Sequence, residues 1–201
     1  MSPTDQPAAT AIFAVTIAVS LLGLYRSPAL IQRCLFRPYW FLRARRYETI
    51  ATSGFVHADL GHLLFNMFTF WFFAFPMERT IGTARFLLLY AARLVLSHAC
   101  SYVKHRDTPE YASLGASGAI SAVLFAYIVY YPLSTLLIFP IPIPIPAALF
   151  AVGYVGYSYW AARAARDRIN HDAHLCGALS GLAFVAVIDP GAWRALLAGL
   201  F

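Results

Sequence analysis

The sequence predicts an all-α integral membrane protein that crosses the bilayer six times. Of its 201 residues, 60% are hydrophobic and 12% are charged, whereas a soluble domain carries about 25% charged residues. Long stretches lack Asp, Glu, Lys and Arg altogether, the longest running from Tyr111 to Ala162. At roughly 20 residues per crossing, six crossings use about 120 residues. The remainder suffices for termini and loops, so we treat residues 1–201 as one membrane domain.

The apolar runs place the spans and the connections between them. The predicted spans cover residues 11–25, 60–75, 86–103, 117–131, 147–162 and 174–188. The first connection, residues 26–59, is rich in Arg and aromatic residues, a mixture that favours the membrane interface. In the run Phe139–Pro146 every second residue is Pro, which excludes a helix there. We therefore expect an extended segment that leads into the fifth span.

The net charge and the cysteines indicate which binding partners and crosslinks to expect. The formal net charge is +6, but the basic residues stand mainly in short loops beside apolar runs, which favours anionic lipid headgroups over nucleic acid. The three cysteines, Cys34, Cys100 and Cys176, form no CxxC pair, and we expect no disulfide framework. The first apolar run follows no basic segment, so we interpret it as a retained span and not as a signal peptide.

Strongly polar residues inside apolar spans are costly and usually mark function. His62 and Asn66 are four residues apart in the second span, so both project from one helical face. Two further features are Ser117 within Gly115–Gly118, and His174 followed by Gly177 and Gly181. Each feature alone is a weak signal, because a serine often bonds back to its own turn and a GxxxG pair often serves packing only. Together the features supply a nucleophile, a base and hydrogen-bond donors.

These motifs resemble those of the rhomboid family of intramembrane serine proteases, in its minimal six-helix form. The resemblance extends from about Arg46 to Asp189. It rests on Gly61–Asn66 in the second span, Glu78–Gly82 after it, Gly115–Gly118 at the start of the fourth, and Ala173–Gly177 with Gly181 in the sixth.

The resemblance implies a Ser-His dyad, with Ser117 as nucleophile and His174 as general base and then general acid. It also implies that the side chains of His62 and Asn66, with the backbone N–H of Ser117, stabilise the oxyanion. No cofactor or metal is implied. The expected substrates are transmembrane segments of other proteins, cut where the helix can unwind.

The glycines have a packing role in this interpretation. A side chain at these positions would separate the helices that carry the dyad. The glycines concerned are Gly115, Gly118, Gly177 and Gly181.

Two residues depart from the pattern or stay unexplained. Many rhomboids have an aromatic residue four positions after the nucleophile, packed on the base, whereas this sequence has Ser121. Arg93 lies within the third span, and the candidate partner for a salt bridge is Glu78.

The membrane orientation has two interpretations. The positive-inside rule places the connections after spans one, three and five in the cytoplasm, because they hold most of the basic residues. The family resemblance implies the reverse, with an extracytoplasmic active site, and we adopt it because the basic first connection is expected to lie in the interface. A minimal chain without a targeting extension favours a bacterial inner membrane.

Two further functions stay open at this point. A metal-dependent intramembrane hydrolase would use the potential zinc ligands at two span ends. A non-catalytic rhomboid-fold protein would bind or escort membrane proteins, although such relatives usually lack the Ser or the His. The potential ligands are His57, Asp59 and His62, and His171, Asp172 and His174.

Overall fold

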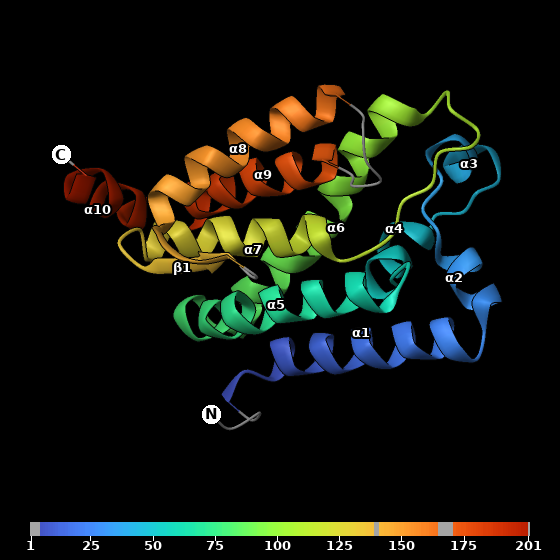
Figure 1. The fold of residues 1–201 in the computed structure, drawn as a ribbon, viewed down its shortest axis with the longest axis horizontal. Helices are drawn as coiled ribbons and strands as arrows, with labels where there is room; N and C mark the ends of the chain where they lie inside the picture. The colour runs from blue at the N-terminus through green and yellow to red at the C-terminus, as the bar shows by residue number, and fades with distance from the viewer. Residues whose placement is uncertain (1–4, 139–140, 165–170, 201) are drawn as a thin grey trace.

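The computed structural model describes residues 5–138, 141–164 and 171–200 as a bundle of helices (Figure 1). Within these residues, the six longest helices follow the order of the six predicted spans. They are α1 (Pro7–Tyr25), α5 (Leu60–Ile81), α6 (Thr83–His105), α7 (Ser117–Tyr130), α8 (Ala147–Ala164) and α9 (His171–Ile188).

The helices are apolar on the outside as well as between one another. Helices α1, α5, α6 and α9 are long and apolar enough to cross a membrane, and α7 is an apolar helix of only 14 residues. Large apolar side chains such as Leu64, Leu88, Val152 and Val187 are exposed. In water such a surface would be an aggregation liability, so it fits contact with lipid.

Helix boundaries depart from the predicted spans mainly at α5 and at the C-terminus. The predicted second span ends at residue 75, but α5 continues through Pro76 to Ile81 and ends at Gly82, whose φ is +80°. The end of the apolar run therefore did not mark the end of the helix. An additional helix, α10 (Pro190–Leu200), follows α9 and was not predicted.

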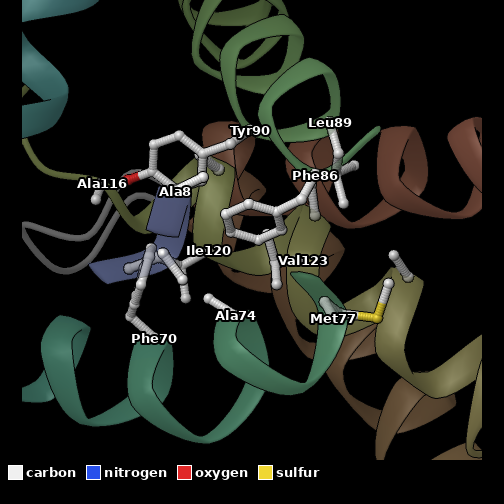
Figure 2. Close-up of a cluster of buried hydrophobic side chains, with 14 of the residues drawn as sticks. Ala8, Phe70, Ala74, Met77, Phe86, Leu89, Tyr90, Ala116, Ile120 and Val123 are labelled. Atoms are coloured by element: carbon white, nitrogen blue, oxygen red, sulfur yellow. The ribbon is translucent and has the colours of Figure 1, made fainter. Parts of the chain in front are cut away.

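Helix α7 is the centre of the bundle. It packs against α5, α6 and α9, and 11 of its 14 residues are buried. Figure 2 shows part of this core, where Phe70 of α5 and Phe86 of α6 lie near Ile120 and Val123 of α7. The first residue of this enclosed helix is Ser117, so the core fixes the position of the predicted nucleophile.

Glu78, part of the motif after the second span, holds α1 against α5. Its buried carboxylate accepts hydrogen bonds from the backbone N–H groups of Ala8 (3.1 Å) and Ala9 (2.6 Å) and from the Thr83 hydroxyl (2.7 Å). The N–H groups of a first helical turn have no intrahelical partner, and a carboxylate satisfies them well. Glu78, the candidate partner of Arg93, forms no salt bridge with it among the described residues; the Arg93 guanidinium instead lies over the Phe184 ring at 5.5 Å.

A disulfide links α6 to α9. It joins Cys100 to Cys176, which are 76 residues apart, while Cys34 is free and buried. The expectation of no disulfide is therefore wrong. Cysteine spacing along the chain carried no signal, because helix packing brings together two residues that are distant in sequence.

We predict that breaking this disulfide lowers thermal stability. A crosslink over a long loop restricts the unfolded chain and typically contributes about 2–4 kcal/mol. Cys100→Ser, or a reductant added to the wild-type protein, should therefore lower the melting temperature in detergent, measured by tryptophan fluorescence. Adding reductant to Cys100→Ser should cause no further shift. An unchanged melting temperature of the reduced wild-type protein would contradict the prediction.

The two irregular connections also have defined structure. The first contains α2 (Pro28–Cys34), α3 (Pro38–Arg43), α4 (Thr49–Thr52) and the 3-10 turn η2 (Ser53–Phe55). The proline run is extended as predicted: β2 (Ile141–Pro146) leads into α8 and pairs antiparallel with β1 (Thr135–Ile138), a hairpin that was not predicted. Residues 139–140 of the run lie outside the described residues.

Candidate active site

The loop that precedes Ser117 is fixed by backbone hydrogen bonds. Ser113 exchanges two of them with Phe36 of the first connection, at 2.9 and 3.0 Å, and the Gly115 N–H donates to the Ser53 carbonyl at 2.8 Å. Gly115 has a φ of +105°, which is strained for a residue with a side chain. A glycine is thus required at this turn, and the chain enters α7 at a defined position.

Glycines at the α7–α9 contact bring the two backbones together. A Cβ at Gly177 would overlap the Gly118 carbonyl oxygen, and one at Gly181 would overlap that of Ala122. Gly118 and Ala122 are four residues apart on α7, and their partners Gly177 and Gly181 are four residues apart on α9. The two helices therefore run parallel in constant register. A Cβ at Gly118 would lie 2.7 Å from the Ser97 Cβ of α6, so three helices meet beside Ser117.

This register places Ser117 and His174 at the same end of the helix pair. His174 is one turn before Gly177 and so shares its face, and Ser117 directly precedes Gly118. The Ala173 carbonyl oxygen is 3.4 Å from the position of a Gly118 Cβ, which brings the backbone beside His174 to the start of α7. Both side chains are partly buried.

His62 lies against the loop that leads to Ser117. The backbone N–H of His62 donates to the Asp59 side chain at 2.7 Å, and this hydrogen bond caps α5. A Cβ at Gly115 would be 2.8 Å from His62 Cε1 and 3.0 Å from Nε2. Asn66, buried one turn further along α5, donates to the His62 carbonyl at 2.9 Å through Nδ2. The side-chain amide nitrogen of Asn66 carries two hydrogens, so one N–H remains that can donate a second hydrogen bond.

A small polar cavity adjoins the start of α7. Its volume is about 20 Å³, enough for one water molecule. Four serine side chains and an imidazole stand around it. The residues that line it are Ser97, His98, Ser101, Ser113, Leu114, Gly115, Ser117, Gly118 and Ala173.

Comparison with known proteins assigns the chain to a protein family. Residues 44–190 match the Rhomboid domain. The chain belongs to the rhomboid family. The family resemblance drawn from the motifs is thereby confirmed, and with it the six-span fold.

Two mitochondrial relatives match most of this rhomboid, and a bacterial relative matches a shorter part. The human presenilin-associated rhomboid-like protein, mitochondrial, is 32% identical over 197 residues, 94% of this chain and 50% of the relative. RHOMBOID-like protein 12, mitochondrial, of Arabidopsis thaliana is 30% identical over 167 residues, 76% of this chain and 49% of the relative. The putative rhomboid protease YdcA of Bacillus subtilis is 38% identical over 79 residues, 39% of each chain. This rhomboid spans about half the length of the two mitochondrial relatives.

The potential zinc ligands of this rhomboid form no group of three that could hold a metal ion among the described residues. Asp59 instead caps α5, and Asp172 pairs with Lys104 of α6 at 2.6 Å. The geometry therefore gives no support to the metal-dependent alternative.

Two tyrosines of α8 contact residues near the predicted dyad of this rhomboid, Ser121 and His171. Ser121 is hydrogen-bonded to the Tyr154 hydroxyl at 2.9 Å, and Tyr157 packs edge-on against His171, whose ring centre is 6.2 Å from that of His174. These tyrosines were not predicted to be part of the site. A signal was present in their spacing of three residues, which puts both on one face of α8.

Proposed function

We propose that this rhomboid is an intramembrane serine endopeptidase that hydrolyses peptide bonds in or near transmembrane segments of other proteins. The observation that carries the proposal is the glycine contact of α7 with α9, which brings the helix that begins with Ser117 beside the helix that carries His174. The name of one relative, a putative rhomboid protease, supports the same function.

The proposed reaction is acyl transfer through Ser117. Its Oγ attacks the scissile carbonyl carbon while His174 accepts the hydroxyl proton. The C–N bond then breaks, the leaving amine takes that proton, and an acyl-enzyme remains. Water attacks the ester with His174 again as base, and the carboxylic acid leaves as Ser117 regains its proton. The cavity that Ser117 lines has room for one water molecule, although His174, the base in this scheme, is not among its lining residues.

The oxyanion is proposed to be stabilised from two sides. The Ser117 N–H belongs to the first turn of α7, where N–H groups lack intrahelical partners and the helix dipole favours negative charge. On the other side, His62 approaches Gly115, two residues before Ser117. Donors that are already oriented need no reorganisation when charge develops.

The length of α7 is compatible with a site below the membrane surface. Its 14 residues span about 21 Å, less than the roughly 30 Å hydrocarbon core. An end of such a helix lies below the membrane surface. A substrate helix that reaches this depth must unwind locally, because its own hydrogen bonds otherwise hold its carbonyl groups.

Covalent labelling of Ser117 by a fluorophosphonate tests the proposal directly. The wild-type protein should be labelled, with the adduct located on Ser117 by mass spectrometry, and His174→Ala should be labelled far more slowly. Binding of transmembrane segments without labelling and without cleavage would instead indicate the non-catalytic escort function. Cleavage that a chelator abolishes and zinc restores, with Ser117→Ala still active, would indicate a metalloenzyme.

Asn66→Ala should lower kcat by about 10²-fold or more, because loss of one oriented oxyanion donor costs about 3 to 4 kcal/mol. Turnover of a transmembrane model substrate measures this, with KM expected to change little. Thr69→Ala on the same helix is the control, because its hydroxyl bonds back to the Phe65 carbonyl and it should keep wild-type turnover. An Asn66→Ala enzyme with wild-type kcat would exclude this donor.

The proposed orientation places the first connection outside the cytoplasm, in a bacterial plasma membrane. One relative is from the bacterium Bacillus subtilis, whereas the two relatives that cover most of the chain are named as mitochondrial. Arg43 is exposed in this connection. Arg43→Cys should react with a membrane-impermeant maleimide in intact spheroplasts, while the parent protein, whose free Cys34 is buried, should not. Reaction only after permeabilisation would reverse the orientation.

A further inference from the structure

A buried polar contact connects α1 to the predicted oxyanion residue His62. His57, between η2 and α5, is fully buried. Its Nδ1 lies 2.9 Å from the hydroxyl oxygen of Ser20 on α1, and that hydroxyl also bonds the Phe55 carbonyl at 3.0 Å. Ser20 lies outside the segment 44–190 that matches the Rhomboid domain.

These two bonds determine the tautomer of His57. A serine hydroxyl has one hydrogen, and a carbonyl oxygen can only accept. Ser20 therefore donates to Phe55 and accepts from the Nδ1–H of His57. Burial lowers the pKa of His57 to about 3, so the ring is neutral at pH 7 and its Nε2 has no hydrogen. Among the described residues this buried nitrogen has no hydrogen-bond partner.

His57 and His62 pack together beside the turn that leads to Ser117. Their ring centres are 4.9 Å apart, with the planes at 76°. A Cβ at Gly115 would lie 2.8 Å from His62 Cε1 and 3.8 Å from His57 Cδ2. The His62 ring thus has the His57 ring on one side and the Gly115 backbone on another, and Ser20 prevents His57 from turning away.

We infer that His57 is a positioning residue, which through its anchor on Ser20 holds the His62 ring in the orientation that donates to the oxyanion. This inference rests on the proposed function. A donor contributes to catalysis only if it already points at the developing charge, and a functional side chain keeps such an orientation when its neighbours restrict its rotamers. Helix α1 would then take part in catalysis without touching the substrate.

Ser20→Ala tests the inference with little change of side-chain volume, although it leaves the Phe55 carbonyl and the His57 Nδ1–H without this partner. We expect kcat to fall about tenfold and KM to stay unchanged, a smaller loss than the roughly 10²-fold expected when an oxyanion donor is removed. Thr16→Val is the matched control. Thr16 is buried one turn earlier on α1 with no hydrogen-bond partner for its hydroxyl among the described residues, so kcat should stay at the wild-type value.

A double-mutant cycle separates positioning from a general structural role. The cycle compares wild type, Ser20→Ala, His62→Ala and the double variant, and a second cycle replaces Ser20→Ala by His57→Ala. If His57 acts through His62, neither Ser20→Ala nor His57→Ala should lower kcat further once His62 is absent. Equal losses in both backgrounds, or no loss with Ser20→Ala, would overturn the inference.

Labelling of Ser117 on the same samples keeps the two proposals apart. Normal fluorophosphonate labelling of wild type together with additive losses in the cycle would overturn the role of His57 and leave the protease proposal intact. Wild-type kcat in His62→Ala would overturn the role of His57 and the oxyanion role of His62, but not the dyad. Cleavage by Ser117→Ala at the wild-type rate would overturn the protease proposal itself, and this inference with it.

Discussion

Replacement of Ser117 by Ala is expected to abolish cleavage of a transmembrane substrate, as is replacement of His174 by Ala. Without the hydroxyl no acyl-enzyme can form, and without the imidazole the hydroxyl stays a weak nucleophile. In a soluble serine protease, loss of either group lowers kcat by about 10⁶-fold. Since the two residues act as one unit, the double variant should be no worse than either single variant. Quantification of cleaved substrate in proteoliposomes measures the effect.

Controls must show that the inactive variants are folded. Ser180→Ala on α9 removes a hydroxyl that bonds back to the Gly177 carbonyl at 2.8 Å, so its turnover should equal that of wild type. The Cys100–Cys176 disulfide should form in every variant, as judged by resistance to a thiol reagent without reductant. Folded Ser117→Ala or His174→Ala that cleaves at the wild-type rate would refute the dyad.

Gly177→Ala is expected to cause the second-largest loss. Its Cβ would overlap the Gly118 carbonyl oxygen, a backbone atom that cannot move without shifting α7. The helices must then separate where Ser117 and His174 are proposed to meet, and a displacement of about 1 Å can cost about 10²-fold in rate. We expect at least this loss in kcat, together with a lower melting temperature, because overpacking typically costs about 1–3 kcal/mol.

Gly156→Ala is the matched control for this substitution. Gly156 is in the helix α8, and a Cβ there would meet nothing within 4 Å. The same chemical change should therefore be neutral or slightly stabilising, since Ala favours helix over Gly by about 1 kcal/mol. Wild-type activity of Gly177→Ala would mean that the close contact of α7 with α9 is not needed for catalysis.

The membrane class and the order of the spans could be predicted from sequence because both depend on local composition. A span needs an apolar run of sufficient length, and each run is visible along the chain without knowledge of its neighbours. The extended conformation of the proline run was predictable for a similar reason, since alternating prolines exclude a helix wherever they occur. The hairpin pairing with β1 was not, because the pairing partner lies outside the run.

The site residues were predictable as a set but their contacts were not. Ser117, His174, His62 and Asn66 are conspicuous because polar residues are rare in apolar spans. Nothing in their spacing shows that Asn66 donates to the His62 carbonyl. His57 was weighed only as a potential zinc ligand, since its anchor Ser20 is 37 residues away.

By itself the sequence determined six apolar spans with a serine, two histidines and an asparagine in them, because hydrophobicity is a property of the local chain. The rhomboid family followed from the resemblance of the motifs that carry these residues. Only the tertiary structure decided which helices touch. It joined Cys100 to Cys176, directed Glu78 to the N-terminus of α1 and not to Arg93, and put the glycines of α7 and α9 face to face. Such contacts depend on helix register and close packing, which join residues that are far apart along the chain.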